Sequence, residues 1–369
     1  MRQIRGGCVF ALGTFLLSAI AIAQPAAKPD DPQLTTYETV KVADGVYAFI
    51  SPEPKVPLVT GNSTVIIGRD AVLVVDTGHF PTLTRRQIDD IRRLTDRPVA
   101  FIVNTHWHAD HNTGNYIYRE QFPAVAIIGT PATQHELANP IPQYDDVKQL
   151  TEGIPIIEKM VAEGKLPNGK VLSKDQLDYF SLMLADARYA LPEFQQAKRV
   201  PPNITFDKRM VVDLGQRTVE ISFLGRGNTA GDAVVYVPDA KVLATGDLLV
   251  APTPYAIGSF IDEWIVTMKA LANYDATVII PGHGPVQHGK QYMLLVTQAL
   301  ESLSQQAHAA VKQGQTQEQF QKSLDLTEFR RKMADDNASR QRVFDQYFVA
   351  PGSVRAYREA KEGPLKDEN

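Results

Sequence analysis

The chain has a single cysteine, and this scarcity sets the first limit on its chemistry. Cys8 stands near the N-terminus, and none of the following residues up to position 369 is a cysteine. If the N-terminal segment is removed, the remaining chain can form no disulfide and offers no thiolate to a metal ion. A metal site in the rest of the chain must therefore use histidine, carboxylate or amide ligands.

The sequence also has no apolar run long enough for a membrane-spanning helix. The longest candidate, Cys8 to Ile20, has about a dozen residues, follows two arginines and precedes Ala-Ile-Ala at 21–23. This pattern predicts a signal peptide over residues 1–23, cut after Ala23. Because Cys8 stands at the start of the apolar run and not at its end, we do not expect a lipid anchor. The mature protein should be periplasmic or secreted, without a stable membrane anchor.

Basic residues are not concentrated in any block. The chain has 38 lysines and arginines against 42 acidic residues, and removal of residues 1–23 takes away two arginines, leaving 36 against 42. A mildly acidic protein without a basic cluster argues against nucleic acid as the substrate. The composition is that of an ordinary globular protein, so we expect a small-molecule substrate. The oligomeric state is not indicated.

One stretch concentrates the residue types that bind metals. Residues 98–103 (PVAFIV) form an apolar, β-branched run of strand length, and 104–111 (NTHWHADH) follow without a gap. His106 and His108, with Asp110 and His111 just after them, can converge only if the backbone turns sharply after the strand. Such a loop offers nitrogen and oxygen ligands to one or two cations, and Zn²⁺ suits this donor set best.

Further polar loops follow other strand-like runs. Asp76-Thr77-Gly78 follows the apolar residues 71–75, and the glycine-rich loop 225–232 (GRGNTAGD) stands between two strands. Asp247 and His283 each follow a short apolar strand, within 245–248 and 281–284. One such residue is usually a turn residue. Several aspartates and histidines at strand ends in one chain favour a common site.

Together these motifs resemble the metallo-β-lactamase superfamily of metallohydrolases over residues 40–290. The resemblance implies an αββα sandwich, an α/β fold with metals at one edge of two sheets. It implies that His106 and His108 bind a first metal and that Asp247 bridges to a second. The second metal would be held by Asp110, His111 and His283. Asp76 would orient the histidine loop from behind the ligands.

The chain departs from the family pattern at Asn228. The family normally places a histidine there, as a third ligand of the first metal, in the motif G-x-x-H-T-x-G. Asparagine coordinates weakly through its carbonyl oxygen, so we expect Asn228 to be a weak or absent ligand. The second site, Asp110/His111/Asp247/His283, should then be the tighter one. A two-metal enzyme with a weak first metal, a one-metal enzyme and a non-catalytic relative remain open.

The rest of the chain predicts additions to the core domain, which we place at residues 36–290. Residues 24–35 should form a disordered leader. Residues 139–203 carry amphipathic helical patterns and predict a helical insertion, which we expect to overhang the site rather than serve as distant scaffold. Residues 291–369 predict a helical C-terminal extension, with a long helix near 291–313 and a polar pair of helices between Gln317 and Lys361.

The expected function is that of an exported zinc-dependent hydrolase. A metal-bound hydroxide would attack an ester or amide of a small molecule, such as a β-lactam or a lactone. Asp110 could hold the water and shuttle its proton. Arg226 and Tyr255 lie near site loops in the sequence and are candidates for substrate contact. The alternative is a non-catalytic metal-binding accessory protein of the same fold.

Overall fold

The computed structural model describes residues 20–21, 33–56, 58–139 and 146–366. The predicted signal peptide and its cleavage site lie outside these residues, apart from β1 (Ile20–Ala21), a short strand that pairs with β2. The predicted disordered leader lies outside them up to residue 32. Its last residues, Gln33–Thr35, form a 3-10 turn (η1), and Leu34 is buried at 9% exposure. The prediction of disorder was therefore wrong for 33–35, because Leu34 packs into the core.

The first sheet has eight strands in sequence order, and its second half is parallel. Strands β5 to β8 run parallel because helices connect them: α1 (Pro81–Leu94) and α3 (Asn115–Gln121) return the chain to the start of the next strand. Pro81 opens α1, where no backbone N–H is needed. After β1, the strands are β2 (Glu38–Ala43), β3 (Val46–Ile50), β4 (Ser63–Ile67), β5 (Val72–Val75), β6 (Val99–Val103), β7 (Ala126–Gly129) and β8 (Ile204–Thr205).

The second sheet has six strands and carries its own helices. Its only parallel pair in the described chain is β12–β13, connected through α7 (Ile261–Leu271). The helix α8 (Gln291–Lys312) follows the sheet in the chain. The strands are β9 (Arg209–Asp213), β10 (Thr218–Phe223), β11 (Ala233–Val237), β12 (Val242–Ala244), β13 (Val278–Ile280) and β14 (Gln287–His288).

Three apolar clusters hold these layers together, which confirms the predicted αββα sandwich. The middle cluster joins side chains of both sheets, such as Leu73 and Val235, both fully buried. One outer cluster packs α1 and α3 on the first sheet, and the other packs α7 and α8 on the second. Such alternation of buried faces is what a four-layer α/β sandwich requires.

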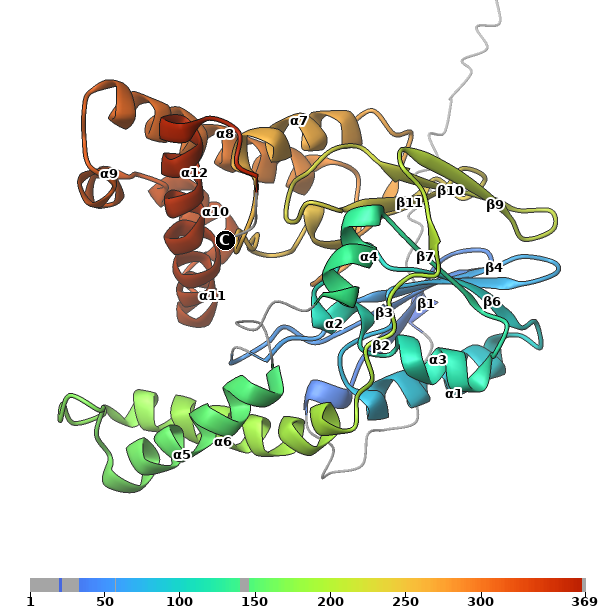
Figure 1. The fold of residues 1–369 in the computed structure, drawn as a ribbon, viewed down its shortest axis with the longest axis horizontal. Helices are drawn as coiled ribbons and strands as arrows, with labels where there is room; N and C mark the ends of the chain where they lie inside the picture. The colour runs from blue at the N-terminus through green and yellow to red at the C-terminus, as the bar shows by residue number, and fades with distance from the viewer. Residues whose placement is uncertain (1–19, 22–32, 57, 140–145, 367–369) are drawn as a thin grey trace, which may run out of the picture.

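The segment between α4 (Pro131–Ala138) and β8 forms a helical hairpin that projects from the sandwich (Figure 1). Its helices are α5 (Asp146–Glu163) and α6 (Lys174–Gln195), and a capping box at Ser173 and Gln176 starts α6. The hairpin is attached at its base, where Glu193 accepts hydrogen bonds from the backbone and the hydroxyl of Thr82 at 2.9 and 2.7 Å.

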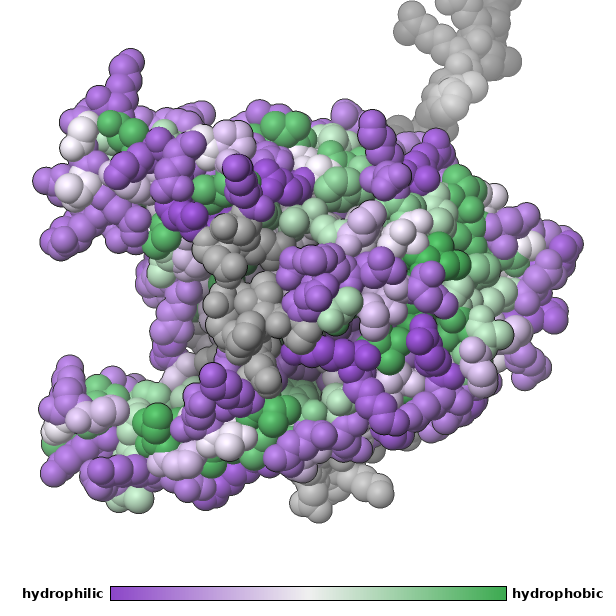
Figure 2. Space-filling view, in the orientation of Figure 1, coloured by the Kyte–Doolittle hydropathy of each residue, from purple (hydrophilic) through white to green (hydrophobic). Residues whose placement is uncertain are grey.

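The prediction of two polar helices after residue 317 was wrong. The chain forms α9 (Gln317–Ser323), α10 (Thr327–Ala334), α11 (Ala338–Val343), the π-helical η4 (Phe344–Val349) and α12 (Ala350–Glu362). Phe320, Phe344 and Phe348 have polar neighbours in the sequence, but their side chains are buried in the apolar cluster that also contains residues of α8. Figure 2 shows a notch between these C-terminal helices and the α5–α6 hairpin. Among the described residues, no helix is both long and apolar enough to cross a membrane.

Candidate metal centre

Four strand ends bring the predicted ligands to one edge of the sandwich. Asp76 follows β5, and the histidine loop follows β6, its parallel neighbour. Asp247 follows β12 in the 3-10 turn η3 (Gly246–Leu248), and His283 follows β13. Because parallel strands end at the same edge, both pairs of loops meet where the two sheets open. A backbone hydrogen bond of 2.9 Å from Gly282 to Gly246 joins the two loops of the second sheet.

The six predicted ligand side chains form two adjoining groups. In one group are His106, His108 and Asp247; in the other are Asp110, His111 and His283. Within each group the ligand atoms lie within 4.8 Å of one another. In the second group, Asp110 Oδ2 lies 3.0 Å from His283 Nε2, and the Nε2 atoms of His111 and His283 are 3.2 Å apart. In the first group, His106 Nε2 lies 2.9 Å from His108 Nδ1.

Asp247 lies between the two groups. Its Oδ2 is 3.8 Å from His106 Nε2, while its Oδ1 is 3.3 Å from His111 Nε2 and 3.6 Å from His283 Nε2. Oδ1 is buried and has no partner of hydrogen-bond geometry in the described chain. Asp247 thus directs one carboxylate oxygen toward each of the two groups.

Asp76 holds the histidine loop in place from behind. Its backbone has a φ of +57°, a left-handed conformation that aspartate tolerates better than most residues. Oδ1 accepts a hydrogen bond from the Thr105 backbone at 2.8 Å, and Oδ2 accepts from the Thr105 hydroxyl at 2.8 Å and lies 2.9 Å from His111 Nδ1. With Nδ1 as donor to Asp76, His111 directs its Nε2 to the cluster, as metal-binding histidines usually do.

The electrostatics of the cluster favour cations. Asp76, Asp110 and Asp247 are buried, and the partners they face are histidines and Thr105. Burial lowers the pKa of His111, but the carboxylates of Asp110, Asp247 and Asp76 outweigh it and hold that pKa well above its usual value. Burial likewise opposes protonation of His283, yet Asp247 and Asp110 raise its pKa to about 9. Three buried carboxylates therefore attract positive charge to this site.

Asn228 has a free carbonyl oxygen at the cluster. Its Nδ2 donates a hydrogen bond of 2.8 Å to the carbonyl of Tyr255, which fixes the orientation of the amide. Its Oδ1 is buried and has no hydrogen-bond partner in the described chain, and the residue lines a cavity together with His108 and Asp247. A buried amide oxygen without a partner costs free energy unless something binds it. The donor set thus fits one or two divalent cations.

Of the two predicted substrate contacts, the structure brings only Tyr255 to the cavity. The ring of Tyr255 lies 5.4 Å from that of His283. Arg226 is directed elsewhere: its guanidinium forms an ion pair with Glu263, donates to the Leu365 carbonyl and lies over the Phe260 ring. The predicted substrate contact of Arg226 was wrong, because proximity in the sequence does not set the direction of a side chain.

Gly61 and Asn62 were missed by the sequence analysis, although they join the ligand loops. The Asn62 backbone N–H donates to Gly282 at 2.6 Å, and its side-chain amide donates to the carbonyls of Pro281 and Gly284 at 2.9 and 2.8 Å. The Gly61 N–H donates to the Asp110 carbonyl at 3.2 Å, and a Cβ on Gly61 would lie 2.5 Å from His111 Cε1. A Gly-Asn pair before a strand signals only a turn in the sequence.

A cavity of about 550 Å³ opens from the cluster toward the α5–α6 hairpin. His108, Asp110, Asn228 and Asp247 form its floor. The hairpin supplies much of the opposite wall, so the insertion does lie over the site. The hairpin residues that line the cavity include Val147, Leu150, Ile154, Ile157, Met183, Ala187 and Phe194.

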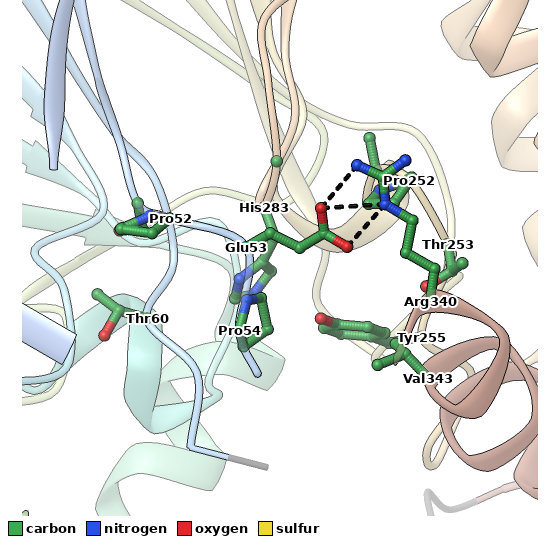
Figure 3. Close-up of a pocket in the computed structure, with 13 residues that line it drawn as sticks. Pro52, Glu53, Pro54, Thr60, Pro252, Thr253, Tyr255, His283, Arg340 and Val343 are labelled. Atoms are coloured by element: carbon green, nitrogen blue, oxygen red, sulfur yellow. Dashed lines mark hydrogen bonds and ion pairs between the residues drawn. The ribbon is translucent and has the colours of Figure 1, made fainter. Parts of the chain in front are cut away.

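The C-terminal helices close another side of the cluster (Figure 3). Glu53, in the loop after β3, forms a bidentate ion pair with Arg340 of α11 at 2.8 Å, beside Tyr255 and His283. Arg342 of the same helix lies over the ring of Tyr179 in α6, 4.7 Å from its centroid. The ring of Tyr347 lies 5.1 Å from that of Tyr255, tilted by 41°, and Tyr347 lines the large cavity. The extension is thus part of the wall of the site.

Comparisons with known proteins agree with this geometry. The model of the metallo-beta-lactamase superfamily matches residues 56–283. The linear primary-alkylsulfatase of Pseudomonas sp. (strain ATCC 19151) is 24% identical over 241 residues, which cover 60% of this chain and 41% of that protein. The chain thus spans less than half the length of this curated relative.

Two solved structures illustrate the likeness of fold. The stereoselective inverting sec-alkylsulfatase Pisa1 from Pseudomonas sp. has a TM-score of 0.60 at 15% identity, over 87% of this chain and 50% of that one. A metallo-beta-lactamase from Pontibacter korlensis has a TM-score of 0.50 at 20% identity, over 72% of this chain and 99% of that one. With the family model matching more than half of its length, the chain belongs to the metallo-beta-lactamase superfamily.

Proposed function

We propose that this protein is an exported zinc-dependent hydrolase that cleaves an ester or amide bond, such as a lactone or a cyclic amide, in a small molecule. The observation that carries the proposal is the cluster itself: two groups of histidines and aspartates, all buried except the half-buried His108, meet at Asp247 and open into a cavity of about 550 Å³. Imidazole and carboxylate donors without a thiolate suit Zn²⁺.

In this proposal, each group holds one divalent cation. His106, His108 and Asp247 hold the first, with the free oxygen of Asn228 as a weak further ligand. Asp110, His111 and His283 hold the second, which Asp247 shares. When bound, the cations polarise the substrate and lower the pKa of water. The second set has the full family complement and is the tighter site.

Asp110 and Tyr255 are the residues we assign to the reaction. Asp110 lines the cavity, and its carboxylate is positioned to accept a proton from water and return it to the leaving group. Burial and then the charge of Asp247 raise the pKa of Tyr255 well above its usual value. The Tyr255 hydroxyl therefore stays protonated and can donate a hydrogen bond to an oxyanion that develops in the cavity.

Hydrolysis of three model substrates tests this proposal. The purified zinc-loaded chain is assayed with nitrocefin, with simple lactones and with thioesters. We expect turnover of at least one class, and loss of that turnover in Asp110→Asn by a factor of about 10² or more. Inactivity on all three classes with zinc bound would rule out the proposed ester or amide reaction.

Sulfate esters are a second candidate substrate class. The curated relative is a linear primary-alkylsulfatase, a solved alkylsulfatase shares the fold at a TM-score of 0.60, and the hairpin lines the cavity with apolar side chains. Release of inorganic sulfate from dodecyl sulfate distinguishes this activity from the first. A chain that retains no zinc and hydrolyses none of these compounds would instead be a non-catalytic accessory protein.

A further inference from the structure

Arg199 lies on the cavity wall and has no acidic partner among the described residues. Lys198 lines the same cavity, but its Nζ forms an ion pair with Glu120 at 3.0 Å and lies over the ring of Tyr116. Asp146, an acidic residue of the wall, faces His79 at 3.4 Å. The guanidinium of Arg199 thus remains available to an anion from solution, with planar N–H donors that suit carboxylate and sulfonate oxygens.

Hydrogen bonds of Asn115 link the backbone beside Arg199 to the start of the histidine loop. Asn115 Nδ2 donates to the carbonyl of Val200, the next residue, at 2.8 Å, and also to Asn104 Oδ1 at 2.8 Å. Asn104 directly follows β6 and is the first residue of the 104–111 loop that carries the histidines. Gln134 Nε2 holds the carbonyl of Pro202 at 2.8 Å. These hydrogen bonds set the position of the Arg199 backbone relative to the cluster before a ligand binds, which lowers the entropic cost of recognition.

An apolar surface completes the cavity that Arg199 and the cluster share. On α5, Leu150, Ile154 and Ile157 recur at intervals of four and three residues, so they lie on one face of the helix. These side chains are only partly buried by the protein and line the cavity. Apolar groups of a ligand placed there are removed from water at a gain of roughly 25 cal/mol per Å².

We propose that the substrate is an amphiphilic anion, recognised at its charged group by Arg199. The scissile bond lies at the cluster, the apolar body lies on the α5 face, and a carboxylate or sulfonate-like group away from the scissile bond pairs with Arg199. This rests on the proposed hydrolysis for the position of the scissile bond. Arg199 is then a specificity-determining residue on the helical insertion, outside the metal-binding loops.

Paired esters test the role of Arg199. The probes are the mono-4-nitrophenyl esters of adipic, suberic and sebacic acids, each paired with the neutral 4-nitrophenyl ester of equal chain length. For at least one pair, zinc-loaded wild type should prefer the anionic ester in kcat/KM by about tenfold, the value of one charge-assisted hydrogen-bonded pair. In Arg199→Gln this preference should disappear, and Arg199→Lys should restore part of it.

Arg188→Gln is the matched control, because Arg188 lies on α6, is paired with Glu158 and does not line the cavity. This control should keep the wild-type preference. Equal losses on both esters of each pair in Arg199→Gln, or no loss at all, would overturn the proposal.

Binding of octane-1-sulfonate separates this inference from the proposed function. The sulfonate cannot be hydrolysed, and calorimetry on zinc-loaded protein should show binding to wild type that Arg199→Gln weakens about tenfold. If neither ester is hydrolysed, and nitrocefin, lactones and thioesters are not hydrolysed either, but the sulfonate binds through Arg199, the proposed function fails and the anion site is supported. If esters are hydrolysed but sulfonate binding and ester preference are the same in wild type and Arg199→Gln, the proposed anion site is wrong and the proposed hydrolase function is retained.

Discussion

The Oδ2 atom of Asp76 lies 2.9 Å from Nδ1 of His111, and the same oxygen accepts a hydrogen bond from the Thr105 hydroxyl. This arrangement links a residue after β5 to the loop after β6. It also fixes which nitrogen of His111 faces the cluster. We therefore propose that Asp76 is a positioning residue rather than a ligand.

Replacement of Asp76 by alanine is expected to weaken zinc binding by about 10- to 100-fold, because His111 loses the partner that orients its ring. Competition with a chromophoric chelator measures this affinity. Asp70→Ala is the control, since Asp70 is exposed and pairs only locally with Arg69. An unchanged zinc affinity in Asp76→Ala would show that the hydrogen bond does not orient the ligand.

Asn228→His is expected to strengthen the weaker zinc site by about tenfold or more, since imidazole is a better zinc ligand than an amide oxygen. Zinc titration of wild type and variant should show two sites whose affinities are closer together in the variant. Asn168→His adds a histidine at an exposed position, where the one printed contact of Asn168 is with the Lys170 backbone, and controls for adventitious binding. Identical stoichiometry and affinity in wild type and Asn228→His would refute our account of this loop.

Gly61→Ala should lower zinc affinity although Gly61 offers no ligand atom. The added Cβ would meet the His111 ring at 2.5 Å, so either the ring or the loop must shift. Gly153→Ala is the matched control, because a Cβ there meets nothing within 4 Å. If both variants bind zinc equally well, the contact between Gly61 and His111 does not determine the ligand geometry.

Zinc binding should release protons at neutral pH. The carboxylates around His283 raise its pKa to about 9, and those around His111 hold its pKa well above normal, so a cation must displace protons from these rings. The apparent affinity should therefore rise as the pH increases from 7 to 9. Calorimetry in buffers of different ionisation enthalpy counts the protons released. An affinity independent of pH over this range would contradict the charge balance we describe.

Glu359 should make stability depend on pH. It accepts hydrogen bonds from the backbone N–H groups of Ile261 and Asp262 at 2.8 and 2.7 Å, at the start of α7, and burial raises its pKa from 4.5 to about 7. The folded protein binds the Glu359 proton more tightly than the unfolded chain does. Protonated Glu359 therefore contributes to the free energy of unfolding at low pH. This contribution is lost as the pH rises from about 4.5 through 7.

Denaturant unfolding of wild type and Glu359→Gln at several pH values between 5 and 8 measures this effect. Relative to the variant, wild type should lose about 2 kcal/mol of unfolding free energy across the range. The difference between the two proteins removes the contribution of the histidine cluster, which both share. A difference that stays constant with pH would show that Glu359 does not titrate in this window.

That the candidate ligands lie together could be predicted from the sequence because their spacing is local or follows strands. His106 to His111 lie in one loop, and Asp76, Asp247 and His283 each end a short apolar strand. Residues that support the site without offering a ligand or reacting group could not be found from their sequence position. Asn62 joins loops through hydrogen bonds to backbone carbonyls more than 200 residues away, and no sequence pattern predicts such partners.

The errors also have physical causes. Arg226 adjoins Gly225, whose φ is +142°, and its side chain turns to Glu263 instead of the cavity. The C-terminal segment was expected to form two helices because its composition is polar. It forms several shorter helices instead, and Phe344 and Phe348 lie in the π-helical turn η4 between α11 and α12, buried in the same apolar cluster as residues of α8. Tertiary packing decided both features.

The dependence of hydrolysis on bound zinc tests the central claim most directly. A chain stripped of metal is titrated with zinc while the initial rate is followed on whichever of nitrocefin, a lactone or a thioester it cleaves. We predict no activity without zinc and a rate that rises with the first equivalent, bound by Asp110, His111, Asp247 and His283. A rate that stays at zero on all three compounds while zinc remains bound, or activity that is unchanged by removal of the metal, would contradict the account.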